Sequence, residues 1–388
     1  MVSGRLLDER QGKIKHIFLT YSSDTQYFRV LNTIKAFDED VRFTVFYNSM
    51  LSTDTYLERI ANETGNEVEL INARGKLPEW VQDGTLVFDN QEIMLSVSNK
   101  TLSKRLRSFQ SVSNLLNLPY WQENGFSVVD CEHTLPNLDG GDLITIGDTT
   151  YVGSYLSSEF IRNFGTKRDV SFKRAQQIVE QELRKLISLE KTKFIGIKQK
   201  PVAQHIDMYF TPLDDVCIIG DVKSSFGELE LPINFGIDKQ LRNMSKNLEA
   251  LATKLAKRKE VIRIPCLPPI KIKDESGREG VIRIQCGHVA YETPNLIPFI
   301  SYNNILVEKF QQDGEEVKRV YMPTYHIDQG AISSLTTPQT HQTLLQQQTR
   351  AQQIYEELGY EVRTVKLEGL IGADGGLRCS TKILKRSN

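Results

Sequence analysis

The sequence predicts an α/β protein assembled from repeated helix–strand units. Amphipathic stretches with helical spacing alternate along the chain with short strands rich in β-branched residues. These units recur at intervals of some tens of residues, which favours a repeated architecture over two unrelated domains. An ordinary doubly wound sheet also alternates helix and strand, so periodicity by itself leaves both arrangements open.

The units can be followed in order along the chain. Helices are expected at 24–37, 53–64, 99–117, 171–188 and 239–258, with following strands at 42–46, 67–71, 126–129, 193–197 and 261–264. In the fourth helix, for example, Ala175, Val179 and Leu183 lie on one face. A last helix has Thr337 as its N-cap and ends before Gly359, and its strand is 361–367.

Composition and charge exclude several classes of function. The chain of 388 residues carries 48 basic and 49 acidic side chains, for a formal net charge of −1, without a basic stripe. We therefore expect no nucleic-acid partner. No run of about 18 apolar residues is present, and the N-terminus lacks the apolar core of a signal peptide. The protein is expected to be cytoplasmic and to bind no membrane, although an unrecognised export signal stays open.

The cysteines predict neither a disulfide framework nor a metal site. They are odd in number, scattered, and lack the spacing of metal ligands, which suits a reducing compartment. The five are Cys131, Cys217, Cys266, Cys286 and Cys379. No metal and no cofactor are expected.

One cysteine lies in a segment that could prepare a nucleophile, Gly375-Gly376-Leu377-Arg378-Cys379. Paired glycines permit close backbone approach or a positive φ. The neighbouring guanidinium of Arg378, together with exposed amides, would favour a thiolate at Cys379 over a thiol. A buried structural cysteine after a loop is the alternative.

Two upstream segments offer carboxylates. In Trp80-Val81-Gln82-Asp83, the acid can accept a bidentate guanidinium that the aromatic ring covers, although a surface Asp at a turn gives the same pattern. The segment Asp139-Gly140-Gly141-Asp142 is explained by turn chemistry, or it delivers one carboxylate into a pocket. The alternating ligands of a calcium loop are missing.

The third upstream segment is His205-Ile206-Asp207-Met208-Tyr209-Phe210. As a strand it would place His205, Asp207 and Tyr209 on one face and the apolar side chains in a core. An imidazole beside a carboxylate supplies a general base and a cation-binding group. A half-solvated strand is the alternative. His326-Ile327-Asp328 repeats the tripeptide, but its flanks indicate a loop, so we expect it to be non-catalytic.

Taken together and in this order, the four segments resemble the guanidine-modifying enzymes of the pentein superfamily. These include arginine, agmatine and peptidylarginine deiminases and amidinotransferases. The resemblance extends from Trp80 to Cys379. It implies a five-bladed α/β propeller with the site on its pseudosymmetry axis. The whole chain, 1–388, would form one catalytic domain with insertions near 221–258 and 267–330.

The resemblance also implies a role for each site residue. Cys379 would be the nucleophile and His205 the acid–base group, oriented by Asp139. Asp83 and Asp207 would grip the guanidinium beside Trp80, and Arg378 and Asp374 are expected to bind substrate. Asp374 stands near where arginine deiminases carry an Arg for the substrate carboxylate. The implied substrate is therefore a guanidino group on a peptide, an amine or another carrier rather than free L-arginine.

The reaction implied is hydrolysis through a covalent thiouronium, releasing ammonia and leaving a ureido, citrulline-like product. The partner would be a guanidino-containing small molecule or a protein arginine, and the oligomeric state is open. The main alternative to the deiminase is an amidinotransferase that uses the same groups. Asp139 lends this alternative slight support, because deiminases usually carry Glu at that position. A thiol peptidase is disfavoured by the paired guanidinium-binding acids. A non-catalytic pentein is disfavoured because Cys379 and His205 are both present.

Overall fold

A computed structural model shows an α/β protein with mixed sheets. It describes residues 4–49, 54–73, 77–78, 80–95, 115, 118–129, 140–153, 165–166, 168–186, 191–194, 205–229, 239–268, 270–271, 280, 282–286, 289–293, 295–297, 299–325, 338–367 and 375–387. Among these residues, no helix is both long and apolar enough to cross a membrane.

Several sheets share one pattern, an antiparallel strand pair extended by a parallel strand. In β7–β8–β9 the pair β7 (Leu143–Ile146) and β8 (Thr149–Val152) is antiparallel, and β9 (Lys191–Phe194) joins β8 in parallel. The helix α7 (Phe172–Leu186) lies between β8 and β9 in sequence. Parallel neighbours need such a crossover, which explains the helix–strand periodicity of the sequence.

The same pattern recurs in four further sheets. One comprises β4 (Thr85–Val87), β5 (Glu92–Leu95) and β6 (Ser127–Val129), with α3 (Val81–Gly84) before it and α5 (Tyr120–Glu123) inside it. Another comprises β10 (Phe210–Pro212), β11 (Val216–Asp221), β12 (Glu260–Leu267) and β17 (Ile300–Ser301), with α8 (Val222–Gly227) and α9 (Lys239–Leu255). A third comprises β18 (Leu306–Gln312), β19 (Glu315–Thr324) and β20 (Glu361–Lys366), with α10 (Pro338–Glu357).

The fourth of these sheets joins the two ends of the sequence. Its order is β21 (Thr381–Arg386), β1 (Ile14–Tyr21), β2 (Arg42–Tyr47) and β3 (Val68–Asn72), with β21 antiparallel to β1. The helices α1 (Tyr27–Lys35) and α2 (Asp54–Asn62) connect its parallel strands. Two short antiparallel pairs, β13 (Ile270–Lys271) with β16 (Asn295–Ile297) and β14 (Ile282–Cys286) with β15 (Val289–Thr293), complete the strands described.

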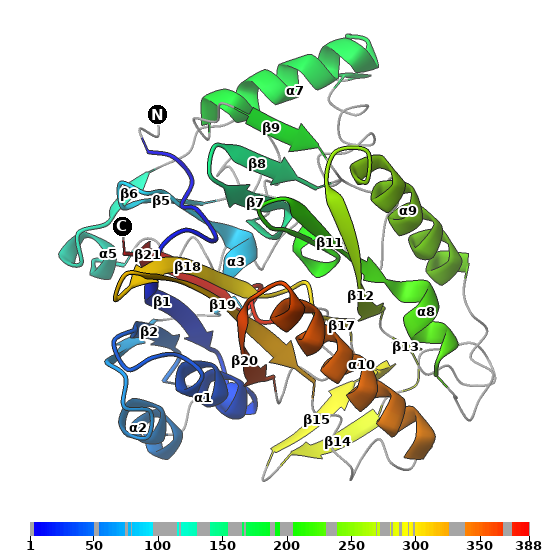
Figure 1. Ribbon diagram of the computed structural model, residues 1–388. Coiled ribbons are helices and arrows are strands. Elements are labelled where there is room, and N and C mark those ends of the chain that lie inside the picture. The colour runs from blue at the N-terminus through cyan, green and yellow to red at the C-terminus, as the bar shows by residue number, and fades with distance from the viewer. Residues whose placement is uncertain are drawn as a thin grey trace.

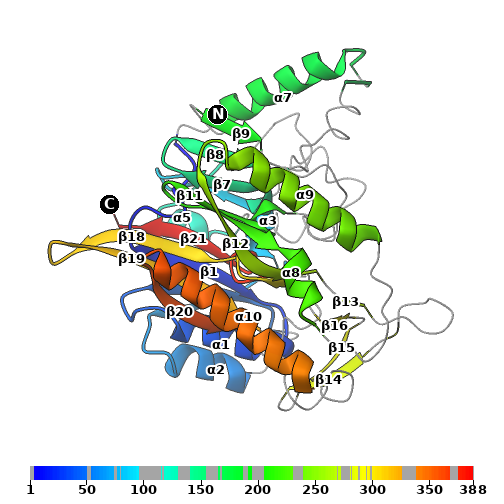
Figure 2. The ribbon, with the colours of Figure 1, turned by 45° about the vertical axis from the view of Figure 1, so that its right-hand side comes forward.

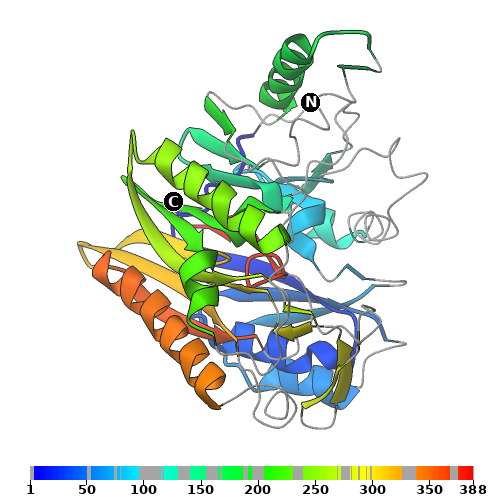
Figure 3. The same ribbon diagram turned by 90° about the vertical axis from the view of Figure 1, so that its right-hand side faces the viewer.

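The long helices lie at the periphery and the strands lie toward the middle. Figures 1 and 2 show α2, α7, α9 and α10 on the outside of their sheets. Each helix buries an apolar face, and the packed side chains form several clusters rather than one. Figure 3 shows the C-terminal segment, in red, enclosed near the centre of the molecule between N-terminal and central elements.

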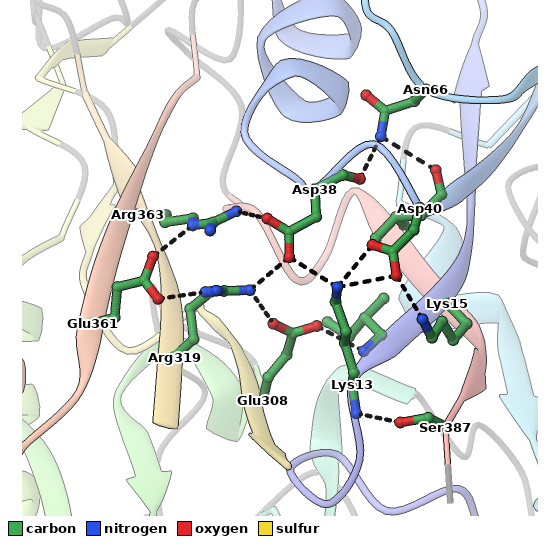
Figure 4. Close-up of polar contacts among 12 residues, drawn as sticks. Lys13, Lys15, Asp38, Asp40, Asn66, Glu308, Arg319, Glu361, Arg363 and Ser387 are labelled. Atoms are coloured by element: carbon green, nitrogen blue, oxygen red, sulfur yellow. Dashed lines mark hydrogen bonds and ion pairs between the residues drawn. The ribbon is translucent and has the colours of Figure 1, made fainter. Parts of the chain in front are cut away.

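A network of ion pairs links β1 to the β18–β20 sheet (Figure 4). Glu308 is fully buried and accepts hydrogen bonds from Arg319 Nη1 at 3.1 Å, Tyr321 Oη at 3.1 Å and the Ile14 backbone N–H at 2.6 Å. Arg319 also binds Asp38 at 2.9 Å and Glu361 at 2.8 Å. Because its charges are shared among several partners, the network satisfies the buried carboxylate of Glu308.

Most of the expected elements are present. The helices expected at 24–37, 53–64, 171–188 and 239–258 correspond to α1, α2, α7 and α9, and each described strand that follows lies within a few residues of its predicted position. The segments expected as insertions supply α8, α9 and β13 to β19. The helix at 99–117 lies almost entirely outside the described residues.

The strand expected at His205 to Phe210 is wrong. Ile206–Met208 form a 3₁₀ turn, η4, and only Phe210 begins a strand, β10. The alternation of polar and apolar residues misled the prediction because Asp207 is buried, like its apolar neighbours Ile206 and Met208. A buried carboxylate requires a partner from elsewhere in the chain, which local periodicity does not report.

Candidate active site

Cys379 lies in the turn that precedes β21, and its side chain is buried against an apolar cluster on one side and polar groups on the other. Asn304 fixes it twice, because its Oδ1 accepts from the Cys379 backbone N–H at 3.2 Å and its Nδ2 donates to Sγ at 3.0 Å. A donor aimed at sulfur favours the thiolate, which is the better acceptor. At the two other cysteines described as free, burial raises the pKa of Cys266 to about 12 and also raises that of Cys217.

His205 and Asp207 meet Cys379 from the other side. His205 is the N-cap of η4, and the tight turn brings Asp207 back toward it. One ring nitrogen of His205, one oxygen of Asp207 and Sγ of Cys379 all lie within 4.8 Å of one another. Sγ is 3.6 Å from Asp207 Oδ2. The structure therefore brings together three of the predicted site residues, from segments about 170 residues apart.

The paired glycines before Cys379 are required by close packing. A Cβ on Gly375 would lie 2.6 Å from the Trp80 ring, and one on Gly376 would lie 2.6 Å from Asn304 Oδ1. Neither glycine has a φ in the left-handed region. Their function in this turn is to let Trp80 and Asn304 approach the backbone, so of the two reasons considered for the glycine pair, close approach applies here.

The first two segments also converge on this turn. The Gln82 backbone N–H donates to the Cys379 carbonyl at 3.2 Å, and Gln82 Nε2 donates to the Gly140 carbonyl at 3.1 Å. Trp80 is half-buried against Gly375. Asp139 and Asp374 lie outside the described residues, as do His326 and Asp328 in the repeated tripeptide, and the side chain of Asp83 is not described either.

Arg378 lies below the site, with every guanidinium nitrogen bonded to the protein. Its Nη1 donates to Asp207 Oδ2 at 2.6 Å, and Nε and Nη2 bind the two oxygens of Glu9 at 2.6 Å each. Nη2 also donates to the Leu143 carbonyl at 2.6 Å. Burial alone would lower the pKa of Arg378, but the charges of Glu9 and Asp207 raise it above the ordinary value.

Sequence reasoning missed three residues of this site. Asn304 was not among the predicted site residues, and nothing local distinguishes it from its neighbour Asn303. Asp142 was quoted in its motif without a role, yet its Oδ1 accepts the Ile206 N–H at 3.1 Å and so holds the turn after His205. Glu9 is one acid in a polar N-terminal stretch, and no sequence signal marked it.

Sulfur, imidazole and carboxylate are also the ligand types of zinc sites. Here Asp207 Oδ2 already binds the Arg378 guanidinium, and Asn304 donates to the sulfur. Those contacts suit a nucleophile beside an acid–base group and a cation-binding acid. We therefore assign no metal to these residues.

The comparisons with known proteins concern the fold. No family model and no curated protein matches the sequence. Among solved structures, an agmatine deiminase from C. jejuni with substrate bound has a TM-score of 0.59 at 10% identity, and the match covers 99% of this chain and 97% of that one. The chain has the agmatine deiminase fold. An agmatine deiminase of Enterococcus faecalis gives a TM-score of 0.55 at 13% identity, over 98% of this chain and 95% of the other.

This result agrees with the resemblance noted in the sequence. Agmatine deiminases belong to the pentein superfamily that the four segments resemble, and the match extends over nearly the full length of both chains. At such low sequence identity, the match shows similarity of the fold alone. The chemistry must be argued from the residues of the site.

Proposed function

We propose that this protein is a cysteine-dependent guanidine deiminase, a hydrolase that acts on a guanidino group other than that of free L-arginine. The observation that carries the proposal is the convergence of His205, Asp207 and Cys379, with their reactive atoms within 4.8 Å of one another. The fold shared with agmatine deiminases supports it. The same proposal includes a cytoplasmic location and no partner among nucleic acids or membranes.

The proposal extends to the architecture. We infer one catalytic domain over 1–388, arranged as a five-bladed propeller, with the segments near 221–258 and 267–330 as insertions. The repeated sheet pattern, an antiparallel pair followed by a parallel strand, supports it. The position of the red C-terminal segment near the centre of Figure 3 agrees with a site close to a central axis.

In the first half-reaction, the Cys379 thiolate attacks the central carbon of the guanidinium and forms a C–S bond. Asp207 and Asp83 hold the planar cation in the orientation that this attack requires, beside Trp80. His205, oriented by Asp139, donates a proton to the leaving nitrogen, and ammonia departs. An S-alkylthiouronium remains on the enzyme.

In the second half-reaction, His205 takes a proton from water, and the resulting hydroxide adds to the thiouronium carbon. The adduct collapses, the C–S bond breaks, and the thiolate returns with a ureido product. Asp374 would lie near the tail of the substrate, where its charge repels a carboxylate and accepts an amine or a neutral group. An amine acceptor in place of water would give amidino transfer by the same residues.

The test is to measure ammonia and ureido product from agmatine, free arginine and an arginine-containing protein in parallel, with and without added acceptor amines. Cys379→Ser should lower turnover of the accepted substrate by at least about 10³-fold, because no other thiol in the described part of the chain lies in the site. Cys217→Ser is the matched control at a buried thiol outside the site, and it should retain activity. Turnover that survives in Cys379→Ala would contradict the mechanism, and transferred amidine without free ammonia would replace hydrolysis by transfer.

A further inference from the structure

The N-terminal strap, which we define as residues 4–12, bonds to the edge strands of three sheets. Its backbone bonds to strands β4, β7 and β18 through the Leu7 N–H to Val87, the Glu9 N–H to Thr145 and the Gly12 N–H to Lys309, each at 2.9 Å. Arg386 on β21 donates to the Glu9 and Gly12 carbonyls at 2.6 and 2.9 Å. The strap is therefore held by its main chain, independently of the Glu9 side chain.

That side chain reaches inward to Arg378. The two carboxylate oxygens of Glu9 bind Nε and Nη2 of Arg378 at 2.6 Å each, a fork-to-fork pair. The third nitrogen of the same guanidinium, Nη1, binds Asp207 Oδ2 at 2.6 Å. Asp207 Oδ2 is in turn 3.6 Å from Cys379 Sγ. One chain of contacts thus leads from the strap to the candidate nucleophile.

The charges along this chain of contacts set the electrostatic character of the site. A buried Arg378 that faced Asp207 alone would neutralise the acid expected to attract a cationic substrate. Glu9 compensates Arg378 from the opposite side, so the three groups carry one net negative charge. The Arg378 side chain is 5% exposed and that of Asp207 is 1% exposed, so solvent screens their interaction only weakly.

We propose that Glu9 is a positioning residue of the active site: it balances Arg378 so that Asp207 keeps its negative charge available for the substrate cation beside Cys379. This inference rests on the proposed function for its substrate and deepens it. The other charged or titratable groups described around the three are His205, Asp142, Asp8, Lys382 and Arg386, the last beside the main chain of Glu9. None of these five makes a described contact with the Arg378 guanidinium.

Glu9→Gln tests the balance because it removes the charge and keeps the size and one acceptor. We expect KM for the accepted guanidine to rise about tenfold while kcat changes less, since binding of the cation loses one compensating charge. The pH midpoint for alkylation of Cys379 by iodoacetamide should move down by about one unit, because the surroundings of the thiolate become more positive. Alkylation is followed by mass spectrometry at Cys379.

Asp8→Asn is the matched control in the same strap. The Asp8 carboxylate accepts only backbone N–H groups in the described structure, those of Arg10, Gln11 and Gly147. The Asp8→Asn variant should leave the pH midpoint for Cys379 alkylation unchanged, even if the substitution lowers the melting temperature. Glu9→Asp keeps the charge and should keep the wild-type midpoint. The proposal would be overturned if the alkylation midpoint shifted as much in Glu9→Asp as in Glu9→Gln. It would also be overturned if Asp8→Asn shifted the midpoint as much as Glu9→Gln.

A second route avoids dependence on one variant. Glu9 and Arg378 both line a small cavity of about 40 Å³, so Glu9→Ala leaves space for a small carboxylate. Added formate should restore KM and the alkylation midpoint, and formamide at the same concentration should not. No effect of formate would count against the role of the charge. The alkylation experiments need no substrate, so they separate a failure of this inference from a failure of the proposed deiminase activity.

Discussion

At the scale of single residues, the orientation of the thiol depends on one amide. Asn304 forms hydrogen bonds with the backbone N–H and the sulfur of Cys379. The Nδ2 of Asn304 also lies 3.2 Å from Met208 Sδ. Both Asn304 and Asn303 are buried, but Asn303 bonds Thr211 and Ile218 and does not contact the thiol. Of these two adjacent asparagines, Asn304 therefore contacts the candidate nucleophile, and Asn303 stabilises the fold.

Asn304→Leu should therefore lower kcat of the accepted substrate by about 10- to 100-fold, the effect of losing a hydrogen bond to a charged group. It should also slow alkylation of Cys379 at neutral pH, because a donor that favours the thiolate is lost. Stopped-time ammonia release and alkylation rates are the measurements. Asn303→Leu is the control, expected to lower stability while Cys379 alkylates at the wild-type rate. Equal alkylation rates in the two variants would remove Asn304 from the site.

At the scale of elements, the β18–β20 sheet is tied to β1 by a buried acid. Glu308 on β18 accepts from Ile14 on β1 and from Arg319 and Tyr321 on β19. Arg319 stays charged, because its carboxylate partners outweigh the burial that would lower its pKa. The network in Figure 4 is a multi-partner junction between two sheets rather than a set of independent surface pairs.

Glu308→Ala should cost about 3–5 kcal/mol of unfolding free energy, because it leaves the buried Arg319 and the Ile14 N–H short of an acceptor. Urea unfolding followed by circular dichroism measures the change. Arg350→Ala is the comparison on an exposed pair, since Arg350 lies 3.9 Å from Glu228 with its side chain 60% exposed. It should change the unfolding free energy by less than about 1 kcal/mol. A similar small cost for Glu308→Ala would mean that the junction is dispensable.

The elements were more predictable from the sequence than the site. Helical spacing located α1 and α9, and predicted caps located α10, because apolar faces and caps are local signals. Thr337, the predicted N-cap of α10, lies outside the described residues. The sequence motifs predicted that His205, Asp207 and Cys379 belong to the site. They did not show that Asp207 is buried against Arg378, 171 residues away, or that Glu9 lies 369 residues from the arginine it binds. Those partners depend on the tertiary fold.

At the scale of the whole molecule, stability should depend on pH through a buried histidine. His16 on β1 is 6% exposed, and its Nε2 lies 2.8 Å from Thr44 Oγ1 on β2. Burial, followed by the charges of Arg42 and Lys385, lowers the pKa of His16 from 6.5 to about 4. The folded protein therefore binds a proton at His16 less readily than the unfolded chain does. Protonation of His16 at low pH consequently favours unfolding.

The stability contributed by neutral His16 is therefore complete above pH 6.5 and is lost as the pH falls from 6.5 toward 4. The full loss is about 3 kcal/mol, from 1.36 kcal/mol for each unit of pKa. Urea unfolding at pH 7 and pH 4.5 should show a steep loss in the wild type and a shallower one in His16→Phe. His341→Asn, on α10, is the control and should keep the wild-type slope. An unchanged slope in His16→Phe would exclude His16 as the origin.

The pairing of β21 with β1, and the grip of Glu9 on Arg378, bear on the order of events during folding. The contacts that build the site join residues 75, 171 and 369 positions apart. Loops of that length close slowly compared with helix formation. A refolding chain should recover its far-ultraviolet signal before its thiol becomes distinguishable from any other, so the catalytic centre matures late, after most of the scaffold has formed.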